Sequence, residues 1–153
     1  MKIHQFWNLS QPATFKPVTS VSIKRVEEEL GVQLPSLLIE LLRIKNGGST
    51  SPMFLNCTDK SIWIDGYYSI EELFGINDES TDRIGILSTP YLISEWDLPE
   101  QQILILGDGH WWITLDYRIN AKEPSVNWIE PEAERDVVIA NNFEEFVRNL
   151  LDE

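Results

Sequence analysis

The stretch that decides the fold is residues 28–48, EELGVQLPSLLIELLRIKNGG. It reads as the end of one helix, a tight joint and a complete second helix. Gly31 stands where a helix needs a left-handed residue after its last turn. Pro35 stands where the first turn of the next helix tolerates a missing N–H. Asn46-Gly47-Gly48 then ends the second helix, so we predict a pair of helices that pack together.

Hydrophobic periodicity predicts the elements around this pair. The predicted helices are 20–30, 35–45, a short one from Ser69 to about Gly75, 90–97 and one starting at Asn142, and the predicted strands are 53–57, 61–65, 102–107, 111–117, 125–130 and 135–140. The short helix rests on the capping-box pattern Ser69-Ile-Glu-Glu72. Because strands and helices do not alternate regularly, we expect an α+β domain, with a mixed, mostly antiparallel sheet and helices packed against it.

The length of 153 residues fits one domain. We predict that residues 1–18, which contain Phe6, Trp7, Leu9 and Phe15, form an arm packed on a domain spanning 19–153, since these side chains are costly to leave in water. No apolar run approaches the length of about 20 residues that spans a bilayer, and the start of the chain lacks the apolar segment of a signal peptide. Cys57 is the single cysteine, which excludes an intramolecular disulfide, so the cytoplasm is the expected compartment. We expect its thiol to be buried and inert.

Charge is unevenly distributed along the chain. The net charge is −13, but residues 1–26 hold four cations and no acid, so the rest carries eight cations against 25 anions. Such a surface repels phosphate backbones, which argues against nucleic-acid binding. It would attract a basic protein and speed the encounter with it. The alternative, that the acidity serves solubility alone, stays open.

Residues with catalytic potential are sparse. His4 and His110 are the two histidines, and no metal-binding or phosphate-binding motif occurs, so no cofactor or metal is predicted. Asp108 and Asp116 flank one predicted strand and offer the one conceivable pair of acid catalysts. Turn and strand-end roles explain both carboxylates equally well.

Tryptophans supply candidate anchors for a partner protein. Alternation along a strand sends Trp111 and Trp112 to opposite faces, so one should lie in the core and the other should be exposed or covered by another element. Trp96, between Glu95 and Asp97, is a further candidate.

The order of these motifs resembles the SUKH superfamily, which includes fungal cell-wall assembly regulators and bacterial immunity proteins. The resemblance rests on the LG-x-x-LP joint, the apolar helix and Asn46-Gly47-Gly48, and it continues through Leu98-Pro99-Glu100, Asp108-Gly109, Ile113–Asp116, Asn127-Trp128-Ile129 and Asn142–Phe146, over about residues 20–152. The acidic, glycine-rich turn of the family is reduced here to Gly107-Asp108-Gly109-His110, and Trp111 and Trp112 stand where the family has small or apolar residues.

The resemblance implies a non-catalytic binding module, and the chain looks like the Bacillus-type immunity proteins that are paired with LXG toxins carrying a nuclease domain. We therefore expect a cognate toxin with a basic, nuclease-like domain as partner and no membrane or nucleic-acid partner. A homodimer is one possible arrangement, and the oligomeric state stays open. The expected footprint consists of Asp78, Glu79, Asp82, Glu95, Trp96, Asp97, Glu100, Asp108, Trp111 and Trp112. A regulatory scaffold is the alternative, and an enzyme using Asp108 and Asp116 is the third hypothesis, which a structural role for either carboxylate would remove.

Overall fold

The computed structural model describes residues 2–56 and 67–151. Its helices are α1 (Ser20–Leu30), α2 (Ser36–Ile44), α3 (Thr89–Trp96) and α4 (Phe143–Leu151), with short 3-10 turns η1 (Ile3–Gln5), η2 (Ile86–Ser88) and η3 (Pro131–Ala133). Its strands are β1 (Gly48–Asn56), β2 (Tyr67–Leu73), β3 (Gln102–Gly107), β4 (Trp112–Asp116), β5 (Ser125–Glu130) and β6 (Arg135–Ala140). The α+β prediction is confirmed, and the described strands form two antiparallel sheets, β1-β2 and β3-β4-β5-β6.

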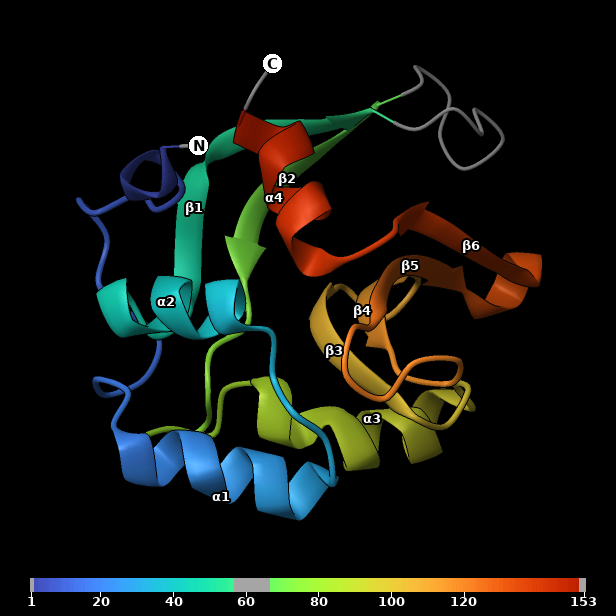
Figure 1. Cartoon of the computed structure of the whole chain (residues 1–153), viewed down its shortest axis with the longest axis horizontal. Coiled ribbons are helices and arrows are strands. Elements are labelled where there is room, and N and C mark those ends of the chain that lie inside the picture. The colour runs from blue at the N-terminus through green and yellow to red at the C-terminus, as the bar shows by residue number, and fades with distance from the viewer. Residues whose placement is uncertain (1, 57–66, 152–153) are drawn as a thin grey trace.

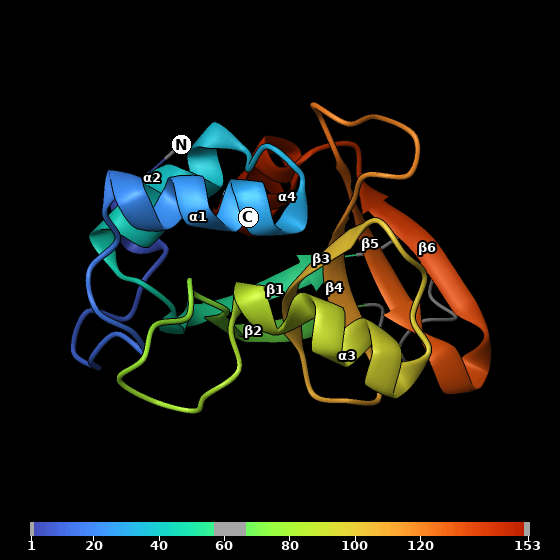
Figure 2. The ribbon, with the colours of Figure 1, turned by 90° about the horizontal axis from the view of Figure 1, so that it is seen from below.

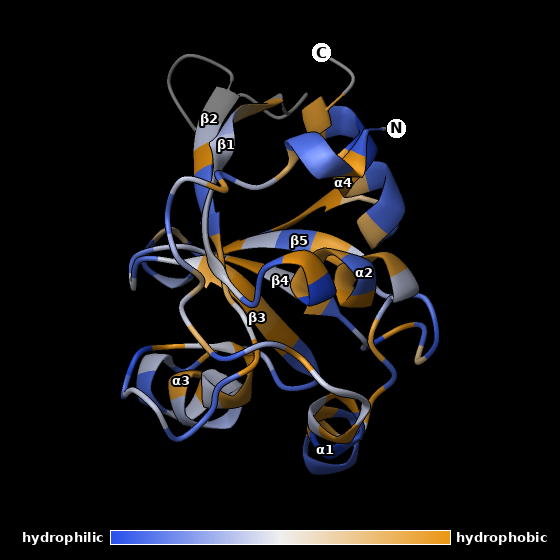
Figure 3. Cartoon of the chain, turned by 90° about the vertical axis from the view of Figure 1, so that its left-hand side faces the viewer, coloured by the Kyte–Doolittle hydropathy of each residue, from blue (hydrophilic) through white to orange (hydrophobic). Residues whose placement is uncertain are grey.

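The two sheets meet at β2 and β3, where the Phe74 amide donates to the Ile105 carbonyl at 2.8 Å. Helix α3 packs against β3, whereas α4 contacts β1, β5 and β6 and also touches α2. Figures 1 and 2 show α3 and α4 on different sides of the four-stranded sheet. Apolar residues line the strands and the inward sides of the helices, and polar residues cover the outer side of α1 (Figure 3). One continuous apolar core therefore joins both sheets.

The joint between α1 and α2 follows the local rules that its sequence suggests. Helix α1 begins after Thr19, whose hydroxyl accepts from the Ser22 amide at 3.1 Å. It ends at Gly31, which adopts φ +68°. The Leu34 amide then donates to the Glu27 carboxylate at 2.8 Å, which ties the joint back to α1. Pro35 lies just before α2 rather than inside its first turn.

Asn46 joins three segments that are far apart in the sequence. Its side chain is 4% exposed. The amide nitrogen donates to the carbonyls of Lys16 at 2.8 Å and Ile76 at 3.0 Å, and the amide oxygen accepts from the Ile76 N–H at 2.7 Å. A Cβ on Gly75 would lie 2.5 Å from the Asn46 backbone, so this close approach requires glycine. The Asn-Gly-Gly motif thus fixes tertiary structure in addition to ending a helix.

The first residues of the chain contribute to the core. Phe6 and Trp7 are buried, and the Trp7 indole N–H donates to the Leu41 carbonyl at 2.8 Å. Trp7 also forms an antiparallel bridge with Thr50 beside β1. Leu9, by contrast, is 65% exposed. The division of the chain into an arm and a domain stays a prediction.

The helix predicted from Ser69 to about Gly75 is wrong, because this segment forms β2. The core buries Ile70 and Leu73, which are three residues apart as they would be on a helix. In β2 these two residues pair with Met53 and Gly48 of β1, and the pairing is irregular between Ser49 and Met53. Pairing with β1 therefore overrides the capping-box pattern. The strand predicted at 61–65 and the thiol of Cys57 lie outside the described residues.

Candidate functional site

Acidic residues gather at one end of the four-stranded sheet. Antiparallel pairing brings the turn between β3 and β4 beside the turn between β5 and β6, and the C-terminal end of α3 lies against them (Figure 2). The sheet-end surface, as we define it, consists of Glu95, Trp96, Asp97, Asp108, Glu132 and Glu134, all of them exposed.

Two contacts connect the segments of the sheet-end surface. The Trp96 ring lies over Gly109, where a Cβ would be 3.3 Å from the indole. His110 Nδ1 lies 4.0 Å from the Glu132 carboxylate in the neighbouring turn. Sequence reasoning missed Glu132 and Glu134, which are more than 20 residues from the predicted acids. Pairing four successive strands as a meander would have placed these turns at the same end.

Trp112 is the member of the tryptophan pair that lies in the core, so its prediction as a partner contact is wrong. It is 2% exposed and packs beside Gly107 and under Trp96, with ring centroids of the two indoles 6.5 Å apart. Trp111 is half-buried on the opposite face and stacks on Trp128, with centroids 4.6 Å apart and planes within 7°. The alternation argument thus holds, and it assigns Trp111 to the surface.

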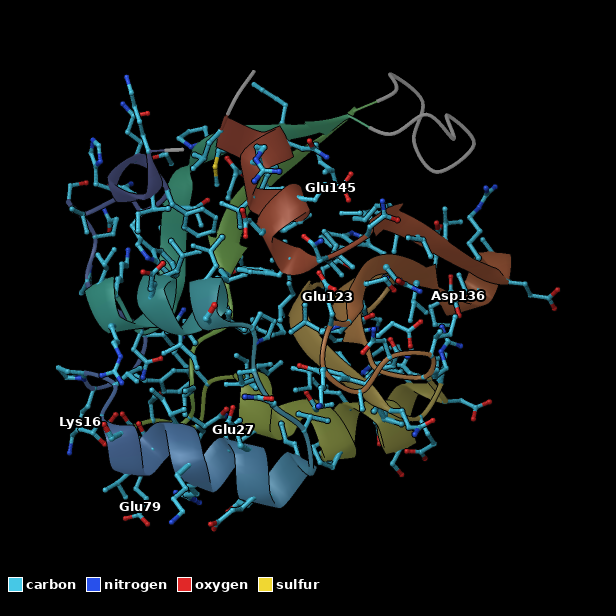
Figure 4. The ribbon with its side chains drawn as sticks, in the orientation of Figure 1. Lys16, Glu27, Glu79, Glu123, Asp136 and Glu145 are labelled. Atoms are coloured by element: carbon cyan, nitrogen blue, oxygen red, sulfur yellow. The ribbon has the colours of Figure 1, made fainter. Side chains whose placement is uncertain are left out.

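The predicted acidic loop of Asp78, Glu79 and Asp82 lies elsewhere. Asp78 accepts from the Lys16 amide and from Ser80, and these hydrogen bonds, that of the Ser80 hydroxyl first, lower the pKa of its carboxyl. The pKa of Arg25 is raised by its hydrogen bond to Glu29 and, to a smaller extent, by the charge of Glu79. Figure 4 shows Glu79 beside α1, across the molecule from Asp136 of β6. This loop therefore sits against the acid-free, basic start of the chain.

Glu100 occupies a third position. It precedes the start of β3 and lines a shallow hollow of about 160 Å³ with residues from the end of α1 and the start of α3. This position lies at the opposite end of β3 from Asp108. The exposed acids of the predicted footprint therefore divide among three places. Glu95, Trp96, Asp97 and Asp108 come together, and Trp111 lies beside Asp108 on the other face of the sheet.

A second hollow lies next to the sheet-end surface, at the seam between the two sheets. It has a volume of about 280 Å³ and is lined by Glu71, Glu72, Asp108 and Trp111 among others. Desolvation there raises the pKa of Glu72, and the charge of Arg83 opposes that shift. Within residues 2–56 and 67–151, no group of three or more His, Cys, Asp or Glu side chains is arranged to hold a metal ion.

Asp116 has a structural role, which removes the enzyme hypothesis based on Asp108 and Asp116. Its carboxylate pairs with the Arg118 guanidinium at 2.9 Å and accepts from Gln102 at 2.7 Å and Asn127 at 3.1 Å. Burial alone would raise the pKa of Asp116, but the hydrogen bonds from Arg118 and Gln102 outweigh burial and lower it. Asp108 lies beyond the opposite end of β4, so the two carboxylates do not face a common substrate.

The fold and the sites define an α+β domain whose exposed features are charged turns and a few aromatic rings. The chain matches the model of the SMI1/KNR4 family (SUKH-1) over residues 17–149, and it therefore belongs to that family. Proteins of this family are generally non-catalytic immunity or regulatory proteins. A comparison with curated proteins found no match. Among the helices that the structure describes, none has the length and apolar character needed to cross a bilayer.

Proposed function

We propose that this protein is an immunity protein, which binds a cognate toxin and neutralises it by covering the toxin's active site. The observation that carries the proposal is the match to SUKH-1 over residues 17–149, because that family includes the immunity proteins of polymorphic toxin systems. The partner is a toxin with a basic, nuclease-like domain, and pairing with an LXG toxin is part of the proposal.

Electrostatics support a basic partner. A nuclease binds the phosphates of its substrate with cationic side chains, so its cleft attracts an acidic inhibitor. The net charge of −13 on this chain makes long-range attraction to such a cleft strong at low salt. Fast association matters for an immunity protein, since the toxin must be bound before it reaches its substrate.

Titration of the toxin domain encoded beside this gene tests the proposal. Increasing amounts of the purified protein should abolish cleavage of RNA or DNA at a one-to-one ratio, and the inhibition should weaken as salt is raised. Full toxin activity in an excess of the protein would refute it. Binding without inhibition would favour the regulatory-scaffold alternative.

A further inference from the structure

We propose that the sheet-end surface is the docking surface for the basic domain of the toxin, and that the loop of Asp78, Glu79 and Asp82 is not. The inference rests on the proposed function and deepens it by assigning the contact to one end of one sheet. Three independent features of this end support it: the balance of charge, an exposed aromatic ring, and a buried hydrogen-bond donor without an acceptor.

The first feature is an excess of negative charge. Glu95, Asp97, Asp108, Glu132 and Glu134 are all exposed at this end. The basic side chains nearby include His110, which faces Glu132, Arg135, which lies 3.9 Å from the Glu130 carboxylate, and Arg83, which lines a neighbouring hollow with Glu72 and Gly107. The 78–82 loop differs, because Lys16 and Arg25 lie against it. A basic partner therefore gains more electrostatic energy at the sheet end than at the loop.

The second feature is the indole of Trp96. It is 41% exposed, although its ring already packs against Trp112 and over Gly109. A ring held in this way loses little conformational entropy when a partner covers its free face. Tryptophan is also among the residues that most often dominate the binding energy of an interface, and it binds cationic side chains over its face.

The third feature lies directly beneath Trp96. Trp112 is 2% exposed, and its indole N–H has no hydrogen-bond acceptor in the part of the chain that the structure describes. A buried donor without a partner is uncommon in a folded protein. This N–H lies under the exposed ring of Trp96. The isolated chain therefore leaves a hydrogen bond unformed at this end of the sheet.

The geometry of the two turns is fixed before any partner arrives. The Asp108 carboxylate accepts from the amides of His110 at 2.9 Å and Trp111 at 3.3 Å, which closes the turn between β3 and β4. In the neighbouring turn, Glu134 ends η3 in a left-handed conformation with φ +53°. Carboxylates on fixed turns need little ordering on binding, so more of their attraction to cations appears as affinity.

Charge-matched variants of the full chain test the proposal. The sheet-end variant carries E95Q, D97N, E132Q and E134Q, and the control variant carries E28Q, E40Q, E79Q and D82N. Both remove four negative charges from exposed positions, and Asp108 is kept because it closes its turn. The probe is the toxin domain encoded beside the gene, and the association rate constant is measured by stopped flow at low ionic strength.

We expect the sheet-end variant to associate about tenfold or more slowly than the wild type, and the control variant to stay within about threefold. In the same assay, W96A should dissociate about tenfold faster, whereas Y91A should match the wild type, although Tyr91 is 67% exposed on the same helix. If W96A proves unstable, the charge variants alone decide the result.

Equal slowing of both charge variants would overturn the proposal, because net charge rather than a surface would then govern binding. A slower control variant with an unchanged sheet-end variant would overturn the proposal, because the contact would then lie away from the sheet end. Both results leave the proposed function intact. Failure of the wild-type protein to bind the toxin domain would instead refute the proposed function together with this inference.

Discussion

Replacing Asn46 with alanine tests whether this side chain holds the fold together. The substitution removes three hydrogen bonds, two to the backbone of Ile76 and one to the carbonyl of Lys16. Because Ile76 is 2% exposed, water cannot easily replace the lost partner of its N–H and carbonyl groups. At about 1 kcal/mol for each bond, with an added cost for polar groups left unpaired, the free energy of unfolding should fall by about 3–4 kcal/mol.

Urea denaturation followed by tryptophan fluorescence measures this change, and a thermal scan should show a midpoint lower by about 6–16 °C for a domain of this size. N149A is the control, since Asn149 is exposed on α4 and its replacement should change the unfolding free energy by less than about 0.5 kcal/mol. A loss below about 1 kcal/mol in N46A would refute the reasoning, because the three segments would then be held by other contacts.

Three further substitutions probe other parts of the structure. D116N should lower the unfolding free energy by about 2 kcal/mol at pH 7. Because folding lowers the pKa of Asp116, the wild type loses this advantage progressively as the pH falls from the ordinary range of an aspartate through the lowered pKa of the folded state, so urea titrations of the two proteins should approach each other in acid. W7F removes the hydrogen bond to the Leu41 carbonyl and should cost about 1 kcal/mol in the same assay, with an unchanged slope against urea. G107A should cost more than about 2 kcal/mol and lower the thermal midpoint, since its Cβ would lie 2.1 Å from the buried ring of Trp112.

The sequence predicted correctly those helices and strands whose ends depend on neighbouring residues, such as helix caps and turns. The bounds of α1 match because its start and end depend on Thr19 and Gly31, which act through neighbouring backbone groups. The bounds of β3 also match, since it is a short apolar run between turn residues, and the bounds of β5 match as well. The capping-box pattern at Ser69 predicted a helix that does not form. This segment pairs with strand β1, which lies outside the local pattern, and that pairing determines its conformation.

The candidate site was predictable only in part, because it is assembled from distant segments. Glu95, Trp96 and Asp97 share one helix end and were found together in the sequence. Glu132 joins them only through the pairing of β4 with β5 and through its contact with His110. The contacts of the 78–82 loop were equally hidden, since the amide that donates to Asp78 belongs to Lys16, more than 60 residues earlier in the chain.

The bridge between Trp7 and Thr50 has a consequence for self-association. Residues 6–8 pair with the outer edge of β1, where the Asn8 amide donates to Ser49 at 3.1 Å and the Ser51 amide donates to Phe6 at 2.8 Å. An open strand edge is a template for pairing with another chain and for aggregation. Removal of the first ten residues would therefore uncover both a strand edge and the apolar surface beneath Phe6 and Trp7. Protein shortened in this way should self-associate through β1, so the oligomeric state has to be measured on the full chain.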